Sequence, residues 1–289
     1  NVTGVQTCAL PILREVYLDA IRELATPYPA IKLDAWPLFT RATGGFRVRE
    51  FTILAGGTGT GKTTLLANIS AQLLRQGVKH FVMSVETGHT DFMKRVISVL
   101  SGVDLNTGDA VPVTTLEAIH QDHADFLEAD TIEFSLYEDR IPVEQLKADI
   151  LWMQRNRGCS IVFIDNLNFF MEVTRSADTI IEMDRVIHEL IILCKQVDVH
   201  LVMVMHPKKN DRGSRLTSEF DIKGSSTAVQ EAHNVLLFNR PDHALIESGD
   251  RSPQDREITI QKMRRRGVHT GKTIILSNQG TRYIEKGLA

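Results

Sequence analysis

The chain has 289 residues, of which 43% are hydrophobic and 24% are charged, and its formal net charge is −3. These values are typical of a soluble globular protein, and they exclude a disordered chain and a surface that is basic throughout. Cys8, Cys159 and Cys194 form neither a C-x-x-C pair nor a zinc-binding spacing, which favours a reducing setting over secretion. No apolar run approaches the ~20 residues of a membrane span, so we expect no membrane association.

The first two segments of the chain are of different kinds. Residues 1–12 (NVTGVQTCALPI) resemble a translated sequencing adapter and have neither an initiator Met nor the basic stretch of a signal peptide. We exclude them from the fold and expect the natural N-terminus, with any domain before it, to be missing. Residues 13–24 carry apolar side chains at helical spacing along one face, which predicts an amphipathic helix. This apolar stripe could pack on its own domain or on a neighbouring subunit.

A phosphate-binding motif follows. Residues 56–63 read GGTGTGKT and match the P-loop pattern G-x-x-x-x-G-K-[ST], between an apolar run at 51–55 and a helix-like stretch. The backbone N–H groups of such a loop surround phosphate oxygens, Lys62 reaches the β- and γ-phosphates, and the Thr63 hydroxyl can ligate Mg²⁺. We therefore expect a bound nucleoside triphosphate. The predicted nucleotide-binding residues are Gly56, Gly57, Thr58, Gly59, Thr60, Gly61, Lys62, Thr63 and Thr64.

Strand-like and helix-like patterns alternate through the rest of the chain. Strands are predicted at 80–85, 131–136, 160–164, 200–205, 234–238, 257–262 and 273–277, and helices at 91–100, 115–128, from Pro142 onward, and at 180–196. This alternation, with apolar strands, predicts an α/β fold whose mostly parallel twisted sheet is covered by helices on both faces. The helical patterns stop towards the C-terminus, which predicts antiparallel strands at one edge of the sheet.

Two carboxylates follow predicted strands. Asp165 ends the strand at 160–164 in the manner of a Walker B motif, and Glu86 ends the strand at 80–85. Because ligands bind at the carboxyl ends of parallel strands, we expect Asp165 to hold Mg²⁺ beside the P-loop, through a water. Glu86 could orient and deprotonate the water that attacks the γ-phosphate. The alternative for Glu86 is to cap the following helix.

His206 follows the strand at 200–205 and precedes a basic segment. Residues 207–216 read PKKNDRGSRL, with four cations, one glycine and no core pattern. His206 could sense the γ-phosphate and relay its loss to this segment, although a lone histidine is often structural. The segment suits contact with a nucleic-acid backbone, and a solvated run of charges is the alternative.

These motifs together resemble those of a known family. Their order is the P-loop, Glu86, the stretch FIDNLNF at 163–169, the stretch MHPKK at 205–209, and Lys262-Met263-Arg264. This order resembles the RecA-like motor domain of hexameric superfamily 4 replicative helicases, of the DnaB type and more closely Twinkle and its phage relatives. The resemblance spans about residues 13–285. It implies that the triphosphate is ATP and that the enzyme is an ATP-dependent DNA helicase acting in replication.

The resemblance also implies a role for each matching residue. Lys62 and Thr63 would bind phosphate and Mg²⁺, Asp165 would support the metal, Glu86 would activate water and His206 would sense the γ-phosphate. Near the C-terminus, Arg264 would be an arginine finger that reaches the ATP of the neighbouring subunit, with Lys262 as its companion. The run Arg264-Arg265-Arg266 leaves the position of the finger open by one or two residues. The implied DNA-binding residues lie in channel loops: Lys208, Lys209, Arg212, Arg215 and Arg175.

The implied organisation is a ring, a hexamer, that translocates 5′ to 3′ on single-stranded or forked DNA in the cytoplasm or nucleoid, or in the mitochondrial matrix of an organellar protein. Residues 13–30 would form a linker helix that docks on a neighbouring subunit, and residues 31–289 the ATPase domain. Family members usually carry a primase-like or collar domain upstream. The alternatives are a RecA-, RadA- or KaiC-like ATPase without unwinding and, further off, a small-molecule P-loop kinase.

Overall fold

The computed structural model describes residues 13–26, 28–137, 141–166, 177–207, 215–218, 221–222, 226–265 and 269–289. Within these ranges, the dominant feature is a nine-stranded sheet in the order β11-β10-β9-β8-β3-β7-β6-β4-β5. Its strands are β3 (Phe51–Ala55), β4 (His80–Ser84), β5 (Ile132–Phe134), β6 (Ile161–Asp165), β7 (His200–Met205), β8 (Asn234–Asn239), β9 (Asp255–Met263), β10 (Thr273–Gln279) and β11 (Arg282–Leu288).

The strands from β8 to β5 are parallel, and those from β8 to β11 are antiparallel. The parallel strands are short and apolar, and β3, β4, β6, β7 and β8 are buried along their whole length. Such strands need cover on both faces. The prediction of an α/β sheet with antiparallel strands at its C-terminal edge is confirmed.

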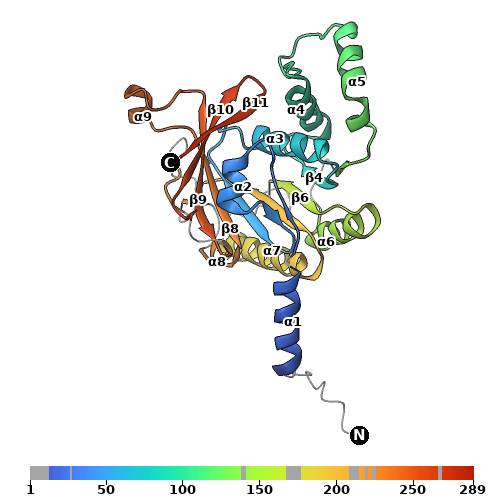
Figure 1. Ribbon diagram of the computed structural model, residues 1–289, viewed down its shortest axis with the longest axis vertical. Coiled ribbons are helices and arrows are strands. Elements are labelled where there is room, and N and C mark those ends of the chain that lie inside the picture. The colour runs from blue at the N-terminus through green and yellow to red at the C-terminus, as the bar shows by residue number, and fades with distance from the viewer. Residues whose placement is uncertain are drawn as a thin grey trace.

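Helices cover both faces of this sheet (Figure 1). Successive strand residues point to opposite faces, so Ile53 packs in one apolar cluster and Leu54 in the other. The first cluster contains residues of α6 (Val143–Trp152), α7 (Ala177–Gln196) and α8 (Ser226–Glu231). The second contains residues of α2 (Pro37–Thr43), α3 (Lys62–Arg75) and α4 (His89–Ser101). The sheet therefore lies between two helical layers.

The predicted helices and strands are all present, with shifts of a few residues at their ends. Several short elements have no counterpart in the sequence patterns: α2, α8, α9 (His243–Glu247), β1 (Ala30–Ile31), β2 (Phe46–Arg47) and β11. The expectation that helices end towards the C-terminus is therefore wrong for α8 and α9, which are too short to show a helical period. The remaining elements are α5 (Val113–Leu127) and a π-helical turn (Met153–Arg157) that continues α6.

Helix α1 (Leu13–Ala25) projects from the body of the molecule (Figure 1). Its apolar side chains are exposed, to 84% at Leu13 and 76% at Leu24. Of the two partners considered for this stripe, its own domain is therefore not the one it packs on. Elsewhere in the described chain, no helix is both long and apolar enough to span a membrane.

Candidate active site

The P-loop joins β3 to α3 and wraps around its own lysine. Gly61 has a φ of +97°, a left-handed conformation that favours glycine, and it begins the turn into α3. The Lys62 ammonium donates hydrogen bonds to the carbonyls of Gly56 and Gly57, at 2.8 Å each. Burial lowers the pKa of Lys62, and the nearby carboxylates of Asp165 and Glu86 oppose this shift. The predicted P-loop, with its lysine directed into the loop, is present.

Thr63 and Asp165 meet beside the P-loop. The Thr63 hydroxyl donates a hydrogen bond of 2.6 Å to Oδ2 of Asp165, which ends β6 and is 2% exposed. Burial raises the pKa of the Asp165 carboxyl, and the bond from Thr63 partly offsets this. A hydroxyl and a carboxylate are hard oxygen donors of the kind that Mg²⁺ prefers, and a cation would neutralise the buried charge. These two residues therefore fit the predicted metal.

Glu86, Asn166 and His206 form a contiguous polar cluster at the same edge. The Asn166 amide donates a hydrogen bond to Oε2 of Glu86, and its Nδ2 lies 3.0 Å from Nε2 of His206. Nδ1 of His206 lies 3.5 Å from the Lys62 ammonium. Glu86 therefore faces the P-loop, and no side chain among the described residues caps α4, whose N-cap is Gly88. This geometry contradicts the capping alternative.

Asn166 has a position that sequence reasoning left unassigned. It is 3% exposed and contacts both the predicted base and the predicted sensor. Its place directly after Asp165 was the available signal, because a residue that follows a strand tip lies at the ligand-binding edge.

A cavity of about 200 Å³ adjoins the start of α3. Gly61 and Thr64 line it from the P-loop side, and Arg256 and Tyr283 line it from β9 and β11. Arg256 also donates a hydrogen bond of 3.0 Å to the carbonyl of Thr60. Sequence reasoning missed Arg256 and Tyr283, because only the pairing of the C-terminal strands brings them to a loop far away in sequence.

Arg264 and Lys262 lie at the opposite edge of the sheet. In the register, Asn234 at the start of β8 pairs both with Thr52 at the start of β3 and with Met263 at the end of β9. Arg264 is thus about five strand residues, or ~16 Å, from the P-loop end of β3. Its guanidinium donates to the carbonyl of Gln230 at 2.7 Å, and the Lys262 ammonium donates to the same carbonyl at 2.5 Å. The fold separates these two residues from the P-loop of their own chain.

The predicted DNA-binding residues can be placed only in part. Lys208, Lys209, Arg212 and Arg175 lie outside the described residues. Arg215 is described, and its side chain turns inward to Glu257 and to the carbonyl of Arg240.

The chain matches a family described as the DnaB-like helicase C terminal domain over residues 36–285. It is similar to a separately solved ATPase domain, with a TM-score of 0.76 and 14% identity, over 96% of this chain and 100% of that one. It is also similar to a DnaB-like replicative helicase solved to study its interactions with primase, with a TM-score of 0.75 and 14% identity, over 95% of this chain and 67% of that one. These two likenesses show the fold, and the family match shows the kinship: the chain belongs to the DnaB-like helicase C-terminal domain family.

Proposed function

We propose that this chain is the ATP-hydrolysing motor of a replicative DNA helicase, working as a hexameric ring with ATP held between subunits. One observation carries the proposal. Lys62, Thr63, Glu86 and Asp165 gather at one edge of the sheet, whereas Arg264 lies at the other. Each chain thus offers one half of a hydrolytic site on either side. Family membership supports DNA, single-stranded or forked, as the partner, and 5′ to 3′ is the direction that the resemblance implies.

The arrangement suits hydrolysis of a phosphoanhydride. Glu86 takes a proton from a water whose oxygen attacks the γ-phosphorus, and the bond to the β–γ bridging oxygen breaks, leaving ADP and phosphate. Lys62 balances charge on the β- and γ-phosphate oxygens. Thr63 and Asp165 would hold Mg²⁺, which supplies further charge neutralisation when bound.

Asn166 is a positioning residue in this scheme. Its amide holds the Glu86 carboxylate and contacts His206 at the same time. His206 also lies beside the Lys62 ammonium, so loss of the γ-phosphate would change its surroundings. His206 is therefore the proposed γ-phosphate sensor, at the start of the basic segment 207–216.

The second half of the site comes from a neighbour. Arg264, with Lys262, reaches the γ-phosphate of the adjacent subunit and stabilises the charge of the transition state. Helix α1, whose apolar face is exposed, docks on an adjacent subunit as part of the linker 13–30, and residues 31–289 form the ATPase domain. The basic residues of the segments around 175 and 207–216 face DNA in the central channel.

The test is strand displacement on a forked duplex, run beside ATP hydrolysis with and without single-stranded DNA. We expect DNA-stimulated hydrolysis and displacement, both lost in Glu86→Gln while ATP binding persists. The matched control is Glu117→Gln, which removes an exposed carboxylate on α5. DNA-stimulated hydrolysis without displacement would instead favour the RecA-like alternative, and hydrolysis indifferent to DNA would contradict both.

A further inference from the structure

We propose that Arg240 and Arg215 connect the P-loop to the C-terminal end of the basic segment 207–216, so that bound nucleotide changes the affinity for DNA through this connection. The inference rests on the proposed function. It adds a contact at the end of the segment opposite to His206, through residues that touch neither the γ-phosphate nor the metal site.

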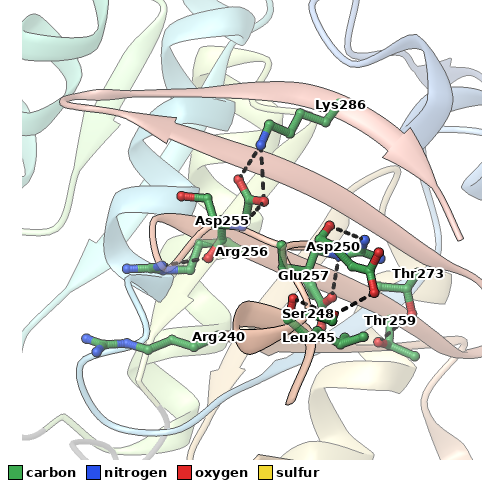
Figure 2. A network of polar contacts seen from close by, with 12 residues as sticks. Arg240, Leu245, Ser248, Asp250, Asp255, Arg256, Glu257, Thr259, Thr273 and Lys286 are labelled. Atoms are coloured by element: carbon green, nitrogen blue, oxygen red, sulfur yellow. Dashed lines mark hydrogen bonds and ion pairs between the residues drawn. The ribbon is translucent and has the colours of Figure 1, made fainter. Parts of the chain in front are cut away.

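The first contact is on the P-loop. The Arg240 guanidinium, which follows the end of β8, donates a hydrogen bond of 2.9 Å to the carbonyl of Gly59. Arg256 on the neighbouring strand β9 donates to the next carbonyl along, that of Thr60. Figure 2 shows both arginines pointing to the same side of the surrounding polar network. Two cations thus hold the carbonyl side of the P-loop.

The second contact lies at residues 215 and 216. The Arg215 guanidinium donates a hydrogen bond of 2.9 Å to the carbonyl of Arg240. The next residue, Leu216, is bound through both its N–H and its carbonyl to the side chain of Asn239, which is 2% exposed. The end of the basic segment is therefore bound to the two residues that carry the P-loop contact.

Glu257 allows this contact to change. It is 1% exposed, and its two oxygens have different partners: Arg215 at 2.5 Å and Arg251 at 3.0 Å. Removing every partner of a buried carboxylate costs several kcal/mol. Because Arg251 remains when Arg215 moves away, the charge of Glu257 stays paired in both positions. Arg215, at 29% side-chain exposure, is the outer partner and the one able to move.

Nucleotide binding acts on this connection through the peptide planes of the P-loop. Backbone N–H groups turned towards phosphate oxygens direct the carbonyls of the same loop away from the nucleotide. The carbonyls of Gly59 and Thr60 then remain directed at Arg240 and Arg256. Nucleotide therefore favours the paired position of Arg240 and, through its carbonyl, that of Arg215. By linkage, DNA that favours this position strengthens nucleotide binding by the same factor.

The experiment measures the dissociation constant of a fluorescent single-stranded oligothymidine, with and without Mg²⁺ and a non-hydrolysable ATP analogue. We expect the analogue to change the wild-type constant by about 10-fold or more, within the usual range of such couplings. In Arg240→Gln the change should shrink to about 2-fold, and the same should hold for Arg215→Gln. The double variant should match the single ones, because both interrupt one chain of contacts.

Arg155→Gln, at an exposed arginine of the π-helical turn, is the matched control for loss of charge and should keep the wild-type change. Arg240 is exposed, so its variant retains the test even if Arg215→Gln fails to fold. A wild-type-sized change in Arg240→Gln, or effects that multiply in the double variant, would overturn the inference alone. A wild-type chain without DNA affinity would overturn the proposed function, and this inference with it.

Discussion

Arg264 begins about five residues down the sheet from the loop that holds Lys62, a distance set by the shared register of β3, β8 and β9. A side chain at that edge faces away from the nucleotide of its own chain. The two residues can therefore act on one ATP only when they belong to different copies of the chain. This relationship makes the site a property of an interface.

Mixing two inactive variants tests this arrangement. Lys62→Ala removes the phosphate-binding ammonium and Arg264→Ala removes the finger, so each variant alone should hydrolyse ATP poorly. In a random 1:1 mixture, about a quarter of heterologous interfaces pair an intact P-loop with an intact finger. Steady-state hydrolysis should therefore recover to about a quarter of the wild-type rate if the interfaces act independently. A mixture no more active than its components would contradict a finger supplied in trans.

The neighbouring arginine has a different part. Arg265 lies 2.8 Å from Glu23 on α1 and 3.4 Å from Glu50, a carboxylate that is 5% exposed. Arg264→Ala should lower kcat by about 10³-fold with little loss of stability, as expected for an arginine finger. Arg265→Ala should instead lower the free energy of unfolding by about 1–2 kcal/mol, a moderate value because the side chain is half-exposed. Urea unfolding and single-turnover hydrolysis separate the two, and the opposite pattern would reassign the finger to Arg265.

Asp165 lowers the stability of the nucleotide-free chain at neutral pH. Burial raises its pKa above the ordinary 3.8, so its contribution to stability is present below that pH and is lost as pH rises through the raised value. Asp165→Asn removes the buried charge at nearly constant volume. We expect the melting temperature at pH 7.5 to rise by about 2–4 °C, with a smaller gain at pH 4, and hydrolysis to fall by about 100-fold. An equal gain in melting temperature at both pH values would argue against a charge effect.

Two buried histidines predict acid lability. His80 and His200 are fully buried, and burial lowers the pKa of each from 6.5 to about 4. In each ring one nitrogen lies within hydrogen-bond distance of a backbone carbonyl and the other of a hydroxyl, which suits the neutral form. A lowered pKa contributes stability above pH 6.5 that is lost as pH falls towards 4.

The free energy of unfolding should therefore decrease by about 3 kcal/mol per histidine between pH 6.5 and 4. His200→Gln should reduce the slope of stability against pH in this window by about 1.4 kcal/mol per pH unit. His120→Gln, at an exposed position of α5, is the control and should leave the slope unchanged. Urea titrations at half-unit pH steps measure it, and an unchanged slope in His200→Gln would exclude this histidine as a cause.

Local pattern alone located one side of the site. Each parallel strand is an apolar run that ends in a polar residue, and the carboxyl ends of parallel strands meet at one edge. The positions of Glu86, Asp165 and His206 beside the P-loop therefore follow from the order of residues along the chain. Their contact through Asn166 does not, because hydrogen bonds between neighbouring strand tips depend on the order of the strands, which the periodicity leaves open.

Helix α2 shows what the sequence by itself leaves undecided. Its N-cap is Trp36, a poor capping residue, and the N–H groups of Leu38 and Phe39 donate instead to the carboxylate of Glu285 on β11, more than 200 residues away. The alternation of patterns determined the α/β class, the P-loop and the acids that follow the strands, because these depend on spacing along the chain. Tertiary structure alone decided which distant groups satisfy a helix end, which arginines hold the P-loop, and that Arg264 lies across the sheet from Lys62. Those outcomes depend on strand order and register, which bring together groups that no local pattern relates.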